Sequence, residues 1–241
     1  MVDSIIAMAK TFANLIYPLH CAVCKKPLDP LDNKGVCAHC AGCVRANPEP
    51  YCGICGHSVE NSSGLCGECK KRHFHFTMAR SACLYEGTIR EAIHVFKYAN
   101  GLRLASFLSG LMADFLKKNN ALIQNIDAVT FVPLDGNRLR HRGFNQAKVL
   151  ASRIAQTVKL PVIDSLDKTM RTSHQSELSR SGRLVNLRDT FRIRNAEDTA
   201  GKKILLVDDV MTTGSTLNEC SKVLIENGAA EVRCLTLARG I

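Results

Sequence analysis

The sequence contains no tryptophan, and aromatic residues make up only 5% of its 241 residues. Few rings are therefore available to enclose a nucleobase or to stack the bases of a single strand, which counts against tight binding of single strands. No apolar run is long enough to cross a bilayer, so we expect no transmembrane segment. The stretch IIAMAKTFANLIYPL follows Asp3, contains Lys10 and lacks a small-residue cleavage site, so we expect no signal peptide.

Positive charge, by contrast, is abundant. The formal net charge is +10 and the isoelectric point is near 9.1. Such a surplus favours polyanionic partners: phosphates, nucleotides or nucleic acid. Hydrophobic residues make up 46% of the chain, which is ordinary for a globular protein, and the length predicts one large domain and a small one.

Cysteine is concentrated near the N-terminus: nine of the twelve cysteines lie between positions 21 and 69. Eight of them form four CxxC pairs: Cys21/Cys24, Cys37/Cys40, Cys52/Cys55 and Cys66/Cys69. Each pair points two thiolates at one point, and two pairs complete a tetrahedral zinc site, so the spacing predicts two structural zinc ribbons. One occupied site and a redox dithiol are the alternatives, and Cys43 could replace Cys40. Because thiolate–zinc sites persist in a reducing compartment, we expect a cytoplasmic protein.

The composition divides the chain into three parts. Residues 1–18 have apolar positions at helical spacing and predict an amphipathic helix. Residues 19–75 form the double zinc ribbon, too poor in large apolar residues to fold without a crosslink. Residues 79–241 alternate strands and helices, which predicts an α/β domain with a parallel sheet. Strands are expected near 80–85, 128–134, 161–163, 202–210 and 231–239, and Cys83, Cys220 and Cys234 are expected to be buried.

The stretch ILLVDDVMTTGST, which begins at Ile204, places two acids at the end of an apolar strand. Ligands of open parallel sheets bind beyond the carboxyl ends of the strands. The following TTGST enters a helix, where free backbone N–H groups and hydroxyls form a nest for a phosphate monoester. Paired carboxylates suit the two vicinal hydroxyls of a ribose. The whole stretch therefore predicts a site for a ribose 5-phosphate.

Three other interpretations of this stretch are weaker. A structural turn does not need two adjacent acids at a strand end. A Walker loop requires a Gly-Lys-Ser/Thr sequence, which is absent here. A response-regulator receiver needs more strands than the remaining chain can supply.

ILLVDDVMTTGST resembles the phosphoribosyl diphosphate (PRPP) signature of type I phosphoribosyltransferases. With the cysteine pairs, the segments YEGTIREAIHVFKYANG, VPLDGNRLRHRGFNQA, RTSHQSELSRSGRLVNLRDTF and LARG resemble the ComF/GntX family over nearly the full chain. The resemblance implies a phosphoribosyltransferase-like fold behind an N-terminal double zinc ribbon. In competent bacteria it also implies an association with natural transformation, the handling of incoming single-stranded DNA.

The resemblance assigns roles to particular positions. Asp208 and Asp209 match the ribose-binding acids. The 5′-phosphate loop corresponds to Thr212, Thr213, Gly214, Ser215 and Thr216. The pyrophosphate turn corresponds to Leu134, Asp135 and Gly136, followed by Arg138, Arg140 and Arg142, although the family more often has a basic residue in this turn. The flexible catalytic loop supplies Arg171, Thr172 and Gln175, and Lys97 is a further diphosphate contact.

Two functions follow as hypotheses. In the first, the protein is an enzyme that transfers phosphoribosyl from PRPP, with Mg²⁺, to an unidentified acceptor and releases pyrophosphate. In the second, it is a catalytically silent PRPP sensor that handles single-stranded DNA with competence-machinery proteins. Its best candidates for stacking bases are Phe74, Phe76 and Phe144. The sequence shows no counterpart of the glutaminase domain that amidophosphoribosyltransferases use to release ammonia from glutamine. We therefore do not expect ammonia to be the acceptor.

Overall fold

The computed structural model describes residues 19–29, 34–60, 64–169 and 190–240. The predicted N-terminal helix at residues 1–18 lies outside the described residues. So do Arg171, Thr172 and Gln175 of the predicted catalytic loop.

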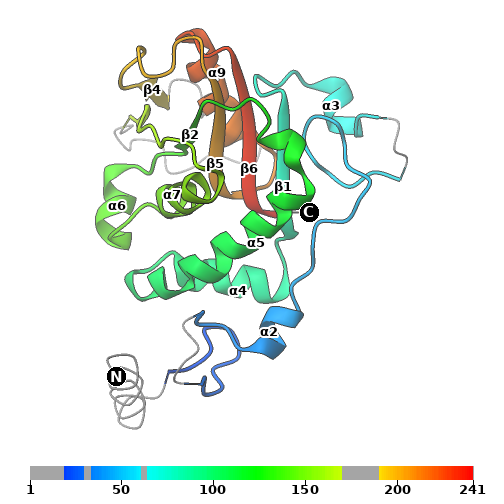
Figure 1. The fold of residues 1–241 in the computed structure, drawn as a ribbon, viewed down its shortest axis with the longest axis vertical. Coiled ribbons are helices and arrows are strands. Elements are labelled where there is room, and N and C mark those ends of the chain that lie inside the picture. Colours follow the sequence, from blue (N-terminus) through cyan, green and yellow to red (C-terminus); the bar gives the residue numbers. More distant parts are fainter. Residues whose placement is uncertain (1–18, 30–33, 61–63, 170–189, 241) are drawn as a thin grey trace, which may run out of the picture.

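A four-stranded parallel sheet forms the centre of the protein, in the order β1-β6-β5-β2 (Figure 1). Its strands are β1 (Met78–Leu84), β2 (Ala128–Phe131), β5 (Lys203–Met211) and β6 (Glu231–Arg239). Ile204–Val207 of β5 are fully buried, as expected for a central strand covered on both faces. The sheet confirms the predicted α/β class.

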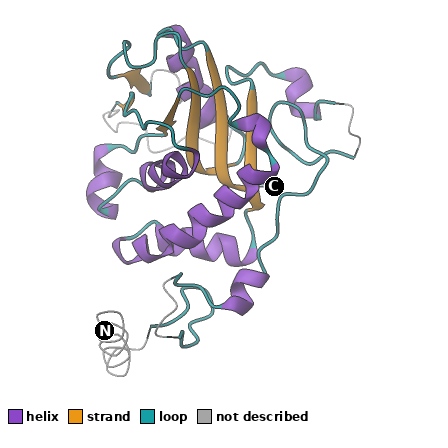
Figure 2. Ribbon diagram, in the orientation of Figure 1, coloured by secondary structure: helices purple, strands orange, loops and turns teal. Residues whose placement is uncertain are grey.

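Helices cover both faces of this sheet (Figure 2). One face carries α4 (Gly87–Phe96), α5 (Ala105–Lys118) and α7 (Gln146–Val158), and the other carries α9 (Ser215–Glu226). Between α4 and α5 the chain forms the 3-10 helix η1 (Ala99–Leu104). A side chain at Gly101 would place its Cβ 2.3 Å from the carbonyl oxygen of Val95, so this crossing requires glycine.

Shorter elements lie around the sheet. After β2 comes α6 (Gly136–Arg142), and β3 (Leu166–Lys168) pairs antiparallel with β4 (Phe191–Ile193). The 3-10 helix η2 (Asn120–Leu122) follows α5. The strand predicted at 161–163 is reduced to one parallel bridge between Val162 and Val129.

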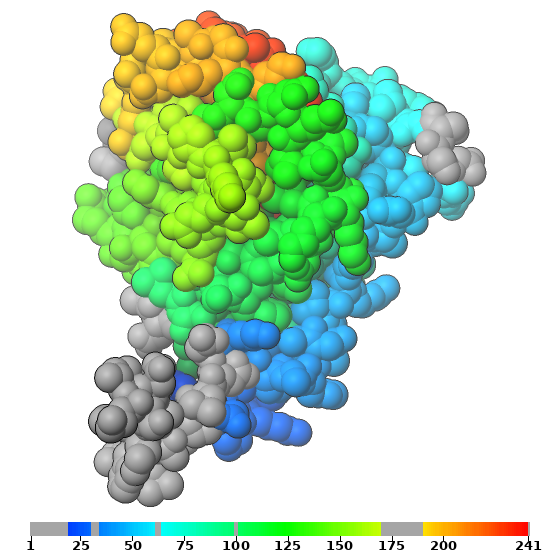
Figure 3. Space-filling view, viewed as in Figure 1, coloured from blue at the N-terminus to red at the C-terminus, as the bar shows by residue number. Residues whose placement is uncertain are grey.

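The two cysteine clusters lie at separate places on this body. Figure 1 shows α2 (Ala38–Gly42) of the first cluster below α4, and α3 (Gly67–Lys71) of the second beside β1. The segment between them pairs with the edge of β1 through an antiparallel bridge from Ala46 to Cys83. In the space-filling view the blue-to-cyan N-terminal part follows one side of the molecule (Figure 3). The domain boundaries given above, 19–75 for the zinc ribbons and 79–241 for the α/β domain, stay predictions.

Among the helices in the described part of the chain, none combines the length and the apolar character that a bilayer crossing requires.

Candidate functional site

Two adjacent acids occupy the carboxyl end of β5. Asp208 pairs in register with Thr236 of β6, so the acids follow directly on the buried core of the sheet. The backbone N–H of Asp209 donates to Oδ1 of Asp208 at 2.8 Å. Nζ of Lys97, which caps the C-terminus of α4, lies 3.5 Å from Oδ2 of Asp209. The structure thus brings three predicted site residues together.

The environment of Asp208 opposes its negative charge. Burial raises the pKa of Asp208 well above its usual value, and the charge of Asp209 raises it further, whereas Lys97 lowers it. Two carboxylates side by side repel each other, so this end of β5 favours a cation or a set of hydroxyl donors. A ribose diol supplies two such donors.

Lys168 is a second cation near the paired acids, and the sequence analysis missed it. Burial lowers the pKa of Lys168, the charge of Arg138 adds to this effect, and Asp135 and Asp208 oppose it. Lys168 ends β3 and lies 5.5 Å from the ring centroid of Phe191. Its position immediately before the basic segment that begins at Thr169 was the available sequence signal.

The hydroxyl-rich loop connects β5 to α9. Gly214 has φ +76°, and a Cβ there would lie 2.7 Å from Cε of Met211, so glycine is required at the start of the helix. The hydroxyls of Thr213 and Ser215 lie 2.9 Å apart, and the N–H of Ser215 faces Oγ1 of Thr213 at 3.4 Å. The first N–H groups of a helix have no partners within the helix, so this loop offers donors to an anion.

The predicted pyrophosphate turn lies beside the acids, at the end of β2. The N–H of Val132 donates to the carbonyl of Val207, which places Leu134 and Asp135 just beyond the level of Asp208. Asp135 accepts a hydrogen bond from the N–H of Arg138 at 2.9 Å and caps α6, which begins at Gly136.

The arginines of α6 are exposed or partly exposed and are engaged locally. Nε of Arg138 lies 3.3 Å from Asp135. Arg140 donates to Asn137, and Arg142 donates to Gln146 at 3.0 Å. Arg138 is thus tied to the predicted turn through Asp135, whereas Arg140 and Arg142 bond to residues of α6 and α7.

Both cysteine clusters bring four Sγ atoms within 4.8 Å of one another: Cys21, Cys24, Cys37 and Cys40 in the first, and Cys52, Cys55, Cys66 and Cys69 in the second. Sγ of Cys24 lies 3.7 Å from that of Cys37, and Sγ of Cys55 lies 3.6 Å from that of Cys66. A tetrahedral zinc with Zn–S bonds of about 2.3 Å requires S–S separations of about 3.8 Å, so both clusters fit zinc. Cys40, not the exposed Cys43, completes the first set.

Within the first cluster, the pKa values of Cys21 and Cys40 are shifted in opposite directions. Although burial raises the pKa of Cys21, backbone N–H groups of Cys37 and Cys24 outweigh it and lower the pKa to about 6. Burial and neighbouring thiols raise the pKa of Cys40 to about 12. Four thiolates this close repel one another, and a bound dication removes that repulsion.

Two arginines of the α/β body contact the second cluster. The buried Arg239, at the end of β6, donates to the carbonyl of Cys55 at 2.9 Å. Arg80 of β1 donates to the carbonyl of Cys52 at 3.3 Å. Their guanidinium charges balance part of the negative charge that a zinc–tetrathiolate group would carry.

The remaining cysteines and the predicted stacking rings are mostly interior. Cys83, Cys220 and Cys234 are buried, as predicted. Phe74 and Phe76 are also buried, so their proposed role in stacking bases was wrong. Phe144 is partly buried against the ring of Phe96.

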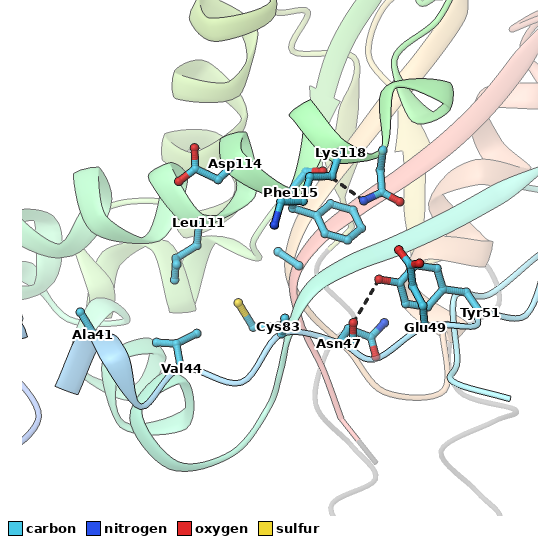
Figure 4. A pocket seen from close by; sticks show the side chains of 13 residues that line it. Ala41, Val44, Asn47, Glu49, Tyr51, Cys83, Leu111, Asp114, Phe115 and Lys118 are labelled. Carbon is cyan, nitrogen blue, oxygen red and sulfur yellow. Dashed lines mark hydrogen bonds between the residues drawn. The ribbon is translucent and has the colours of Figure 1, made fainter. Parts of the chain in front are cut away.

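A cavity of about 510 Å³ lies away from the acids, between α5 and the segment that joins the cysteine clusters. Figure 4 shows Val44 of that segment below Leu111 of α5, and Asn47 below Phe115. Tyr51 donates to the carbonyl of Asn47 at 3.0 Å. None of the predicted phosphate- or sugar-binding residues is among the residues that line this cavity.

Two family descriptions match this chain, one over the α/β part and one over the cysteine-rich part. The description Phosphoribosyl transferase domain matches residues 118–241, and Double zinc ribbon domain matches residues 12–70. The DNA utilization protein YhgH of Escherichia coli K12 is 30% identical over 228 residues, covering 93% of this chain and 99% of that protein. The chain belongs to the ComF/GntX family.

Other relatives of this ComF/GntX protein are similar over comparable lengths. Competence protein F of Haemophilus influenzae is 29% identical over 92% of this chain and 98% of its own. Competence protein ComFC of Bacillus subtilis is 26% identical over 85% of this chain and 84% of its own.

Among solved structures, glutamine PRPP amidotransferase from B. subtilis is 19% identical with a TM-score of 0.42, covering 60% of this chain and 30% of that one.

Proposed function

We propose that this protein binds PRPP with Mg²⁺ at the carboxyl edge of its sheet and transfers the phosphoribosyl group to an acceptor, releasing pyrophosphate. One observation carries the proposal: the paired acids Asp208 and Asp209 run directly into the hydroxyl loop at the start of α9. A sugar diol and the phosphate on the same sugar fit these two groups together. Membership of the ComF/GntX family supports the assignment.

Each group has a distinct task in this reaction. The carboxylates of Asp208 and Asp209 accept hydrogen bonds from the ribose 2′- and 3′-hydroxyls and stabilise the positive charge that develops on the ring. The loop from Thr212 to Thr216 holds the 5′-phosphate. Lys97 and Lys168 supply positive charge for the diphosphate. Mg²⁺, when bound, neutralises charge on the leaving diphosphate.

The test separates binding from turnover. Calorimetry with PRPP and Mg²⁺ should show binding by the wild type and not by the double variant Asp208→Asn/Asp209→Asn. Glu197→Gln, which removes an exposed acid elsewhere, should bind as the wild type does. When metabolite extract is added together with PRPP and Mg²⁺, the wild type should release pyrophosphate and the double variant should not. Absence of heat from PRPP with the wild type would falsify the proposal.

A second candidate function is PRPP sensing without turnover, joined to the handling of single-stranded DNA. The relatives' names support it, as does one surface next to the site. Tyr98 is 45% exposed, and its ring packs edge-on against His94 and His141, beside the arginines of α6. Exposed rings among basic side chains are the features with which proteins bind single strands.

The two candidates give different outcomes. Under the second, PRPP binds without pyrophosphate release in any extract, and single strands bind with strong salt dependence. Tyr98→Ala and Arg140→Ala should then weaken DNA binding, whereas Arg153→Ala on the exposed side of α7 should not. We place either activity in the cytoplasm, because free thiols at eight zinc-ligand positions require a reducing compartment.

A further inference from the structure

The chain that leaves the second cysteine cluster packs directly on the hydroxyl loop and α9. Nη2 of Arg72 donates to Oγ of Ser215 at 3.4 Å. The backbone N–H of His75 donates to Oδ1 of Asn218 at 2.7 Å, one turn further along the helix. A Cβ at Gly214 would lie 3.5 Å from the ring of Phe74 and 2.7 Å from Cε of Met211. The zinc-ribbon module therefore forms one wall of the phosphate loop.

Arg72 is held in place from both sides. Its backbone N–H donates to the carbonyl of Glu68 at 3.0 Å and closes α3, whose Cys69 is the last thiol of the second cluster. Its guanidinium stacks over the ring of Phe74 at 5.3 Å. A planar guanidinium has five N–H donors, so the contact with Ser215 leaves others available for a phosphate.

The charge of the loop explains why a cation is needed there. Thr212, Thr213, Ser215 and Thr216 offer only neutral donors. The nearby acids Asp208 and Asp209 repel a phosphate dianion, and Lys97 is paired with Asp209. Within the described residues, Arg72 is the cation that a hydrogen bond connects to this loop.

We propose that Arg72, supplied by the second zinc ribbon, binds the 5′-phosphate of the ligand together with the loop from Thr212 to Thr216. This inference rests on the proposed PRPP site. The ligand site is then composite: the sugar contacts come from the sheet and the charge on the phosphate is met by the zinc-ribbon module.

The experiment measures two ligands that divide PRPP between them: ribose 5-phosphate, and pyrophosphate with Mg²⁺. Arg72→Ala should weaken ribose 5-phosphate binding by about tenfold to a hundredfold, the range for a hydrogen bond to a charged group. It should leave the affinity for magnesium pyrophosphate unchanged. Arg72→Lys should restore part of the loss. Lys71→Ala, which removes the adjacent exposed charge, is the matched control and should bind both ligands normally.

Zinc content and melting temperature are measured on every variant, so that loss of the fold is not mistaken for loss of a contact. If Arg72→Ala loses zinc, Arg72→Gln replaces it, because its amide keeps a donor and most of the stem. Equal ribose 5-phosphate affinity in the wild type and a zinc-replete variant overturns the role of Arg72 alone. A parallel loss for pyrophosphate also overturns it, since a general effect of charge would then suffice. Failure of the wild type to bind ribose 5-phosphate overturns the PRPP site itself, and this inference with it.

Discussion

Nζ of Lys97 lies 3.5 Å from Oδ2 of Asp209, and this ion pair connects the end of α4 to the end of β5. Both side chains are mostly buried, with 27% and 16% of their surface exposed. Without a ligand, the lysine offsets the repulsion between Asp208 and Asp209. In the proposed complex with PRPP, the same charge is available to the diphosphate.

Lys97→Met keeps the side-chain stem and removes the charge. We expect PRPP affinity in the presence of Mg²⁺ to fall by about tenfold or more, because one charge-assisted contact is lost. Isothermal calorimetry measures this change. Lys117→Met, on the exposed face of α5, is the control. Unchanged PRPP affinity in Lys97→Met would show that the lysine serves only its partner carboxylate.

Asp208→Asn should stabilise the protein when no ligand is bound. The pKa of Asp208 is raised in the folded state, so the folded chain holds this proton more tightly than the unfolded chain. The resulting contribution favours folding at low pH and is lost as the pH rises through the raised pKa. We therefore expect a higher Tm for Asp208→Asn at pH 8, by about 2–4 °C for each kcal/mol of relief, and a difference that shrinks toward pH 4.

Calorimetric scans of the ligand-free variants test this stability claim. Asp209→Asn serves as the comparison: it also removes the like charge beside Asp208, but it breaks the ion pair with Lys97, so its gain should be smaller. Equal Tm values for the wild type and Asp208→Asn at pH 8 would contradict the prediction. The gain in stability should accompany a loss of PRPP binding, as is common for strained sites.

The cysteine clusters predict a stoichiometry of two zinc ions per chain. Cys40→Ser should reduce it to one, whereas Cys43→Ser should leave two, because Cys43 is exposed and outside the first cluster. Elemental analysis of the purified variants measures this directly. A single zinc in the wild type, or loss of zinc in Cys43→Ser, would go against the assigned ligand sets.

Removal of zinc should also weaken ligand binding. The second cluster holds α3, and Arg72 at its end contacts Ser215. Treatment with a chelator should therefore lower both the Tm and the affinity for ribose 5-phosphate. Adding zinc back should restore both. If affinity is unaffected while zinc is absent, the module does not contribute to the phosphate site.

Gly214→Ala should damage both folding and phosphate binding. Its φ of +76° strains any residue with a Cβ, so we expect a loss of about 1–2 kcal/mol from the backbone alone, and Cε of Met211, 2.7 Å from the new Cβ, must also shift. Gly110→Ala in α5 is the matched control, because a Cβ there meets nothing within 4 Å. That variant should be neutral or more stable by up to about 1 kcal/mol, as for alanine in a helix. Chemical unfolding of the two variants makes the comparison.

Local patterns accounted for much of the fold. The apolar run before Asp208 predicted β5, and the structure places that strand at Lys203–Met211. The apolar stretch at 231–239 predicted the closing strand, which the structure places at Glu231–Arg239. The strand at 161–163 was overestimated, because a run this short receives only one bridge at the edge of the sheet. Aromatic residues were the weakest case: nothing local distinguishes the buried Phe74 from the exposed Tyr98.

By itself the sequence determined the four CxxC pairs and the acid–hydroxyl stretch, because their members lie close together in the chain and their spacing carries the geometry. The structure decided that Cys40, and not Cys43, belongs to the first cluster. Only the tertiary structure decided which distant groups join the acid–hydroxyl stretch. Lys97 meets Asp209 from the end of α4, and Arg72 meets Ser215 across 143 positions of chain. Such contacts depend on how the cysteine module docks on α9 and how α4 lies beside the sheet. These arrangements follow from the packing of whole surfaces, which no short run of residues encodes.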